Sequence, residues 1–219
     1  MDSCLIIPAY NAELTLEAVL AEVTRQPLPV LVVNDGSTDA TTAIAGRWPV
    51  TVVSHPVNRG KGAALKTGFA WALSHGFTGM VTLDADGQHD PGAIPRLVAA
   101  GAAGHGIVLA SRYAQFQQMA GLRKHWNRFG AWCMRTRTGF AIDDSQSGFR
   151  YYSADLLRQV KLDRDGYDLE MELLVKAWRA GFSIDSLPVP ARVADGRATS
   201  HFRPVRDTWN ICMTFLKYM

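Results

Sequence analysis

Short apolar runs alternate with helix-length segments through the first half of the chain, and this alternation restricts the fold more than any other feature. The runs are almost uninterrupted, which is typical of strands buried on both faces of a parallel sheet. The expected strands are 5–8, 30–34, 50–54, 80–84 and 107–111. The segments between them that predict helices are 14–24, 39–47, 62–75 and 91–103. We therefore predict an α/β fold in which helices flank a mostly parallel, Rossmann-like sheet.

The length of 219 residues is near the upper limit for one hydrophobic core, so we predict a single domain over 1–219. No apolar run approaches the ~20 residues that a membrane-spanning helix needs. The first residues also lack the basic and apolar regions of a signal peptide. We expect a cytoplasmic protein.

A last amphipathic helix is expected over 207–219, where the residues on one face are Trp209, Cys212, Met213 and Leu216. That face would either pack on the core or lie at a membrane surface. Arginines cluster nearby, in 192–206, and again in 112–137. They favour an anionic membrane surface or a phosphorylated substrate, and we expect no nucleic-acid partner because no recognition-helix, zinc-finger or RNP pattern is present. The protein would then sit peripherally on the inner face of the membrane.

Polar side chains follow several of the expected strands at the point where each strand ends. Tyr10 and Asn11 follow the first, Asp35 the second, and Ser111 and Arg112 the fifth. Ligands of open α/β sheets bind at this edge, so these groups should converge on one crevice. The patterns GxGxxG and GxxxxGK[ST] are absent, which argues against a dinucleotide dehydrogenase and a P-loop NTPase.

The fourth expected strand runs into the sequence DADGQ at 84–88. Asp84, Asp86 and Gln88 offer alternating oxygen atoms, the ligands that Mg²⁺ and Mn²⁺ prefer. An Asp-x-Asp triplet alone is also explained by turn or helix-capping chemistry. Its place after a buried strand, with Gly87 loosening the turn, favours a metal site.

Five motifs in order resemble the inverting family-two glycosyltransferases of the GT-A fold. They are PAYN at 8–11, VNDGSTD at 33–39, NRGKG at 58–62, DADGQH at 84–89 and SRY at 111–113. Three later motifs resemble the dolichyl-phosphate mannosyltransferase-like branch of that family. They are DSQSGFR at 144–150, GYDLEME at 166–172 and SHFRP at 200–204.

The resemblance implies a nucleotide-sugar donor, UDP- or GDP-linked, bound by about residues 1–112, with the acceptor bound by about residues 113–219. The residues implied for the donor are Pro8, Ala9, Tyr10, Asn11, Asp35, Lys61, Asp84, Ala85, Asp86, Arg192 and His201. Asp84, Asp86 and Gln88 would hold Mg²⁺ or Mn²⁺ against the diphosphate, where the cation stabilises the leaving group. Lys61, within Gly-Lys-Gly, is explained equally well as part of a helix-start turn. The chain departs from the branch at Ala12, where a Glu is usual.

The resemblance implies a polyprenyl-phosphate acceptor and admits a membrane partner protein. A phosphate monoester is already an anion near neutral pH, so it needs cations to position it rather than a base. By the resemblance, Arg112, Arg123 and Asn127 would hold that phosphate and, with Asp86, form the catalytic set. A hydroxyl acceptor on a lipid or aromatic metabolite, with Asp143 or Asp144 as base, is the first alternative. An inactive nucleotide-sugar-binding subunit is the second.

Overall fold

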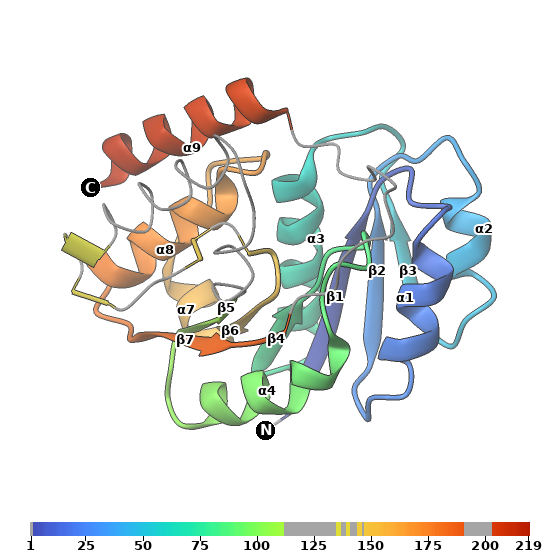
Figure 1. Cartoon of the computed structure of the whole chain (residues 1–219), viewed down its shortest axis with the longest axis horizontal. Coiled ribbons are helices and arrows are strands. Elements are labelled where there is room, and N and C mark those ends of the chain that lie inside the picture. Colours follow the sequence, from blue (N-terminus) through green and yellow to red (C-terminus); the bar gives the residue numbers. More distant parts are fainter. Residues whose placement is uncertain (1, 112–134, 137–138, 141–143, 146, 191–202) are drawn as a thin grey trace.

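The computed structural model describes residues 2–111, 135–136, 139–140, 144–145, 147–190 and 203–219. Their centre is a seven-stranded sheet with the order β3-β2-β1-β4-β6-β5-β7, flanked by helices (Figure 1). The strands are β1 (Ser3–Ala9), β2 (Val30–Asn34), β3 (Thr51–Ser54), β4 (Gly79–Thr82), β5 (Ile107–Ser111), β6 (Arg150–Ser153) and β7 (Ile184–Pro188). Only β6 runs antiparallel to its neighbours, β4 and β5. The predicted α/β fold with a mostly parallel sheet is confirmed.

The helices pack on the two faces of the sheet. Those of the first part of the chain are α1 (Leu16–Val23), α2 (Thr41–Ala45), α3 (Lys61–Ser74) and, after a 3₁₀ turn at Pro91–Ala93, α4 (Ile94–Ala102). Those of the later part are α7 (Ala154–Gln159), α8 (Leu169–Arg179) and α9 (Pro204–Tyr218). All four predicted helices of the first part are present, each within a few residues of its expected bounds.

Strand β1 explains why the apolar runs are uninterrupted. Its successive side chains point to opposite faces. Cys4 and Ile6 belong to the core cluster that α3, α7 and α8 cover, whereas Leu5 and Ile7 belong to the cluster under α1, α2 and α4. All four side chains are fully buried, so these consecutive positions are apolar on both faces of the strand.

The helix expected over 39–47 is shorter than predicted, because polar side chains shape its start. The Asp39 carboxylate accepts hydrogen bonds from the backbone N–H of Thr41, at 3.0 Å, and of Glu13, at 3.1 Å. These bonds hold a turn in which the backbone is not yet helical, and Asn, Asp and Ser side chains commonly compete with helices in this way. The helix therefore begins only at Thr41.

Four elements after residue 111 were not predicted from the sequence: β6, α7, α8 and β7. Strand β6 begins with Arg150, which has no exposed surface. Its guanidinium donates to the carbonyls of Ser145, Ser147 and Glu170 at 2.8, 2.6 and 2.9 Å. A charged residue satisfied by backbone oxygens interrupts the apolar pattern that would have indicated a buried strand.

The packed face of α9 is not the one that carries Trp209. Ile211, Phe215 and Tyr218 pack against the core cluster shared by α3 and α8. The hydroxyl of Thr214 lies among them and donates to Oδ2 of Asp168 at 2.9 Å. This stripe recurs every three to four residues, as expected for one side of a helix.

The opposite side of α9 carries Trp209, Met213 and Leu216, whose exposed fractions are 66%, 43% and 68%. The core-packing interpretation of that face is therefore wrong for these three side chains, because the stripe of Ile211 and Phe215 occupies the core instead. No helix in the described part of the chain is both long and apolar enough to cross a membrane.

Candidate active site

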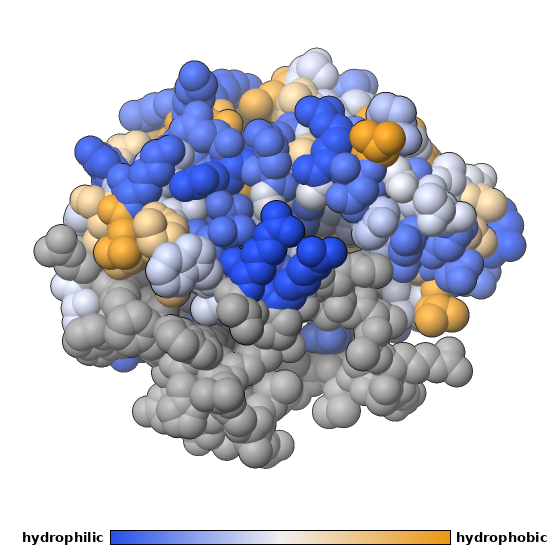
Figure 2. All heavy atoms as spheres, turned by 90° about the horizontal axis from the view of Figure 1, so that it is seen from above, coloured by the Kyte–Doolittle hydropathy of each residue, from blue (hydrophilic) through white to orange (hydrophobic). Residues whose placement is uncertain are grey.

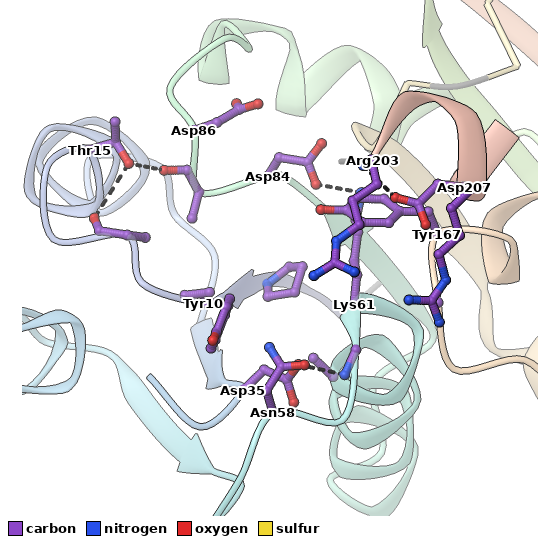
Figure 3. A pocket seen from close by; sticks show the side chains of 18 residues that line it. Tyr10, Thr15, Asp35, Asn58, Lys61, Asp84, Asp86, Tyr167, Arg203 and Asp207 are labelled. Carbon is purple, nitrogen blue, oxygen red and sulfur yellow. Dashed lines mark hydrogen bonds and ion pairs between the residues drawn. The ribbon is translucent and has the colours of Figure 1, made fainter. Parts of the chain in front are cut away.

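A cavity of about 580 Å³ opens where β1, β2 and β4 end, between these strands and the start of α9 (Figure 3). Eight residues predicted from the sequence line it. They are Pro8, Ala9, Tyr10, Asp35, Lys61, Asp84, Ala85 and Asp86. The expected convergence of strand-end residues on one crevice is confirmed for this set.

Two predicted residues do not line the cavity. The side chain of Asn11, whose φ is 45°, accepts from the N–H of Thr38 at 2.9 Å and so shapes the loop after β1. Gln88 contributes its backbone N–H to Oδ1 of Asp86 at 3.0 Å, and its metal role stays a prediction. Five predicted residues lie outside the described part of the chain. They are Arg112, Arg123, Asn127, Arg192 and His201.

Lys61 opens helix α3 and places its ammonium group between two carboxylates. It lies 2.7 Å from Oδ1 of Asp84 and 3.2 Å from Oε1 of Glu170. Burial by itself would lower the pKa of Lys61 and raise that of Asp84, but their mutual attraction outweighs burial in both groups. The pKa of Lys61 is therefore raised and that of Asp84 is held well below its usual range, so both groups are charged. Lys61 is thus both the start of a helix and a residue of the cavity.

Asp86 is the second carboxylate of the cavity and differs from Asp84 in its electrostatics. Burial, and then the negative charge of Asp84, raise the pKa of Asp86. Two like charges that share one cavity attract a divalent cation strongly, because the cation neutralises both. The described residues contain no group of three or more His, Cys, Asp or Glu that could hold a metal ion. A cation here would need further oxygens from a ligand such as a diphosphate, or from water.

Gly148 keeps space for the carboxylate of Asp84. A Cβ atom built on Gly148 would overlap the carboxylate oxygens of Asp84. The carbonyl of Gly148 accepts from the hydroxyl of Thr82, on β4, at 2.9 Å, so the glycine cannot move away without breaking this buried bond. Only a residue without a side chain fits beside the cavity carboxylate.

Asp35 is almost fully buried, and it organises the loop that follows β3. Its carboxylate accepts from the backbone N–H groups of Arg59 and Gly60 at 2.9 and 2.8 Å. It also accepts from Nδ1 of His55 at 2.6 Å. Since a carboxylate can only accept, Nδ1 carries a proton, and Nε2 is hydrogen-bonded to the hydroxyl of Thr67 at 2.9 Å. Asp35 therefore fixes the loop as well as lining the cavity.

Sequence reasoning did not assign several residues that line the cavity. They are Ala12, Thr15, Asn58, Gly60, Ala64, Gly166, Tyr167, Arg203, Arg206 and Asp207. Thr15 is placed by a hydrogen bond of 2.6 Å to the carbonyl of Ala85. Arg203 and Arg206 belong to an arginine cluster that the sequence does reveal, although charge alone cannot place it at the strand ends.

Comparison with known proteins identifies the family. Residues 4–164 match glycosyl transferase family 2. Polyprenol monophosphomannose synthase of Mycolicibacterium smegmatis is 31% identical over 202 residues, which cover 84% of this chain and 75% of the relative. Undecaprenyl-phosphate mannosyltransferase of Micrococcus luteus is 33% identical over 198 residues, covering 84% of this chain and 81% of the relative.

Solved structures support the same fold. Glucosyl-3-phosphoglycerate synthase of Mycobacterium tuberculosis, in complex with uridine diphosphate, superposes with a TM-score of 0.78 at 24% identity, covering 99% of this chain and 79% of that one. Its complex with Mn²⁺, uridine diphosphate and glucosyl-3-phosphoglycerate gives a TM-score of 0.76 at 23% identity, with coverage of 99% and 79%.

The sheet, the strand-end cavity and these matches define a GT-A glycosyltransferase. The chain belongs to glycosyl transferase family 2. The resemblance to the dolichyl-phosphate mannosyltransferase-like branch is confirmed as well, since relatives bearing such names match over most of the chain.

Proposed function

We propose that this enzyme transfers a sugar from a UDP- or GDP-linked donor to the phosphate of a polyprenyl-type lipid. An oxygen of the acceptor phosphate attacks the anomeric carbon, the bond from that carbon to the nucleotide diphosphate breaks, and the configuration inverts. The observation that best supports this proposal is the cavity at the strand ends. It contains the carboxylates of Asp84 and Asp86 and the ammonium group of Lys61. One relative is named as a polyprenol monophosphomannose synthase and another as an undecaprenyl-phosphate mannosyltransferase. These names support a lipid-phosphate acceptor.

Asp84 and Asp86 would hold a Mg²⁺ or Mn²⁺ ion, with Gln88 as a further predicted ligand. The ion would supply charge stabilisation for the departing diphosphate. The residues fit such an ion, because Asp84 is ionised and Asp86 faces the same cavity. The solved relative that contains Mn²⁺ and uridine diphosphate supports a metal of this kind.

Within the donor site, Pro8, Tyr10 and Asp35 would frame the nucleobase and ribose, and Lys61 would face the sugar or phosphates. Tyr10 and Asp35 lie at one end of the cavity, while Asp84 and Asp86 lie at the other (Figure 3). This separation suits a nucleotide-sugar, whose base and diphosphate are at different ends. Arg192 and His201 would close over the diphosphate, and Arg112, Arg123 and Asn127 would hold the acceptor phosphate.

The alternative acceptor is a hydroxyl group. A hydroxyl acceptor would need a base to take its proton. Asp144, one of the two candidates, is fully buried and does not line the cavity. This favours the phosphate acceptor, which needs no base. Asp143, the other candidate, lies outside the described residues.

We also propose that the protein binds peripherally to an anionic membrane, where a polyprenyl phosphate would be held. The exposed apolar face of α9 and the basic residues on that helix support this location. An amphipathic helix with such a composition lies in the interface rather than across the bilayer.

One experiment tests the reaction. Purified enzyme with Mn²⁺ is offered a panel of UDP- and GDP-sugars and either a polyprenyl phosphate or the matching polyprenol, and the products are identified by mass spectrometry. We expect a glycosyl ester of the phosphate from one donor and no product from the polyprenol. Asp86→Ala, or EDTA, should abolish the product. A product from the polyprenol alone would overturn the proposal.

A further inference from the structure

Two arginines enter the cavity from the start of α9. Neither is among the proposed donor and acceptor residues, although Arg203 belongs to the motif SHFRP at 200–204. Arg203 precedes the helix, and Arg206 lies in its first turn. Both line the cavity. In Figure 3, Arg203 stands on the side of Tyr167 and Asp207, opposite Thr15 and Asp86, with Asp84 between the two sides.

The two guanidinium groups carry positive charge that no ion pair neutralises within the described part of the chain. Arg203 and Arg206 are exposed, and neither has a salt bridge there. Asp207, the acidic residue beside them, uses its Oδ2 atom to accept from the backbone N–H of Arg203 at 2.6 Å. This bond caps the helix and leaves the guanidinium groups free to meet an anion.

Helix α9 is held firmly enough to place these arginines. The buried bond from Thr214 to Asp168 ties it to the N-cap of α8. At its far end, the Arg179 guanidinium donates to the carbonyl of Tyr218 at 2.9 Å. Asp168 directly follows Tyr167, which lines the cavity, so the helix and that wall are joined at adjacent residues. The helix from which the arginines project therefore has a fixed position beside the cavity.

We propose that Arg203 and Arg206 form a phosphate-binding subsite on the α9 side of the cavity. The guanidinium group matches phosphate oxygens in pairs of hydrogen bonds, and it is the side chain most suited to that task. Across the cavity, the carboxylates of Asp84 and Asp86 would repel the same phosphate, so it is held on the arginine side unless a cation intervenes. The cavity thus has a positive side, formed by the two arginines, and a negative side, formed by the two aspartates.

The inference rests on the proposed function for the origin of the phosphate, which has two sources. It is either the diphosphate of the donor nucleotide or the monoester of the lipid acceptor. The chemistry of recognition is the same in both. The sources differ in which ligand loses affinity when an arginine is removed.

Calorimetry with Arg203→Ala, Arg206→Ala and the double variant tests the subsite without any turnover. The titrants are UDP and GDP with Mn²⁺, and a short polyprenyl phosphate beside its polyprenol. Loss of a charge-assisted hydrogen bond should weaken binding of one phosphate ligand roughly 10- to 100-fold per arginine. Arg158→Ala is the matched control, since that exposed arginine pairs with Asp155 on α7 and does not line the cavity.

Weaker nucleotide binding assigns the subsite to the donor diphosphate, and weaker polyprenyl phosphate binding assigns it to the acceptor. Either result supports the inference, provided that the melting temperature is unchanged. Affinities within twofold of the wild type for all ligands would overturn it, as would a wild type that binds none of them. The wild type could also bind phosphate ligands but transfer no sugar to polyprenyl phosphate. The proposed reaction would then be wrong, and the affinities of the arginine variants would still test the phosphate subsite.

Discussion

The ammonium group of Lys61 lies 2.7 Å from Oδ1 of Asp84, so the cavity holds a cation of its own beside the strongest candidate for a metal ligand. Glu170 shares this cation, and its side chain is more deeply buried than that of Asp84. Lys61 is thus one positive charge shared by two carboxylates.

Replacing Lys61 with Met should destabilise the fold by about 3 to 5 kcal/mol, because it removes the buried ammonium group that pairs with both Asp84 and Glu170. Urea denaturation at neutral pH measures the loss. Lys66→Met is the control: its partner Asp165 is 60% exposed, and such pairs contribute at most about 1 kcal/mol. Mn²⁺ should restore more stability to the Lys61 variant than to the wild type. Equal losses in the two variants would contradict this account.

Gly148→Ala should disturb the metal site through Asp84. The added methyl group overlaps the carboxylate, and a displacement of about 1 Å at a reacting centre can slow turnover on the order of 100-fold. We expect weaker Mn²⁺ binding by calorimetry together with slower transfer. Gly46→Ala is the matched control, since its φ is −65° and the new Cβ meets only ordinary contacts. Normal Mn²⁺ affinity in Gly148→Ala would refute the packing argument.

Asp35→Asn should weaken nucleotide binding more than it slows the bound complex. Asp35 accepts on both carboxylate oxygens, whereas the amide keeps one acceptor oxygen and turns an NH2 group toward another donor. The loop that borders the cavity therefore loosens. We expect a rise of about 10-fold in the dissociation constant, measured by calorimetry. Thr67→Val, which removes only the outer partner of His55, should give a smaller rise in the same direction. An unchanged constant for Asp35→Asn would exclude this role.

Replacing Trp209, Met213 and Leu216 together with Ser should reduce binding to vesicles that contain anionic lipid. These side chains are exposed, so the melting temperature should stay within a few degrees of the wild type. Flotation with anionic and with neutral vesicles measures the change. Ile211→Ser is the opposite control, because it alters the packed side of α9 and should lower the melting temperature. Equal flotation of the triple variant and the wild type would argue against membrane binding through this face.

The sequence predicted the first five strands because each reads as a short apolar run, and β1, β2, β4 and β5 are largely buried on both sides. It also placed Tyr10, Asp35 and Asp84 at one crevice, because parallel strands end at one edge of the sheet. It did not reveal β6, where Arg150 is hydrogen-bonded to backbone carbonyls that come together only after folding.

The same limit applies to the wall of the cavity that α9 forms. Arg203 is one arginine among several in its cluster, and only the packing of α9 on α8 distinguishes it. Local periodicity could not decide which side of α9 is buried, because both sides carry apolar residues. Ile211 and Phe215 lie on one side, and Met213 lies on the other. The choice depends on which stripe meets α8, a contact between segments far apart in the sequence.

The position of β6 has a consequence for how the molecule is made. In the described sheet, β4 pairs with β1 and β6, while β5 pairs only with β6 and β7. A nascent chain that has emerged as far as β5 therefore has four joined strands and a fifth with no neighbour to pair with. The open edge of β4 is the kind of surface that recruits other chains, so this intermediate is at risk of aggregation until residues 150–153 arrive. Nucleotide binding should accordingly be acquired in one late, cooperative step of synthesis, and a fragment that stops after β5 should not acquire it.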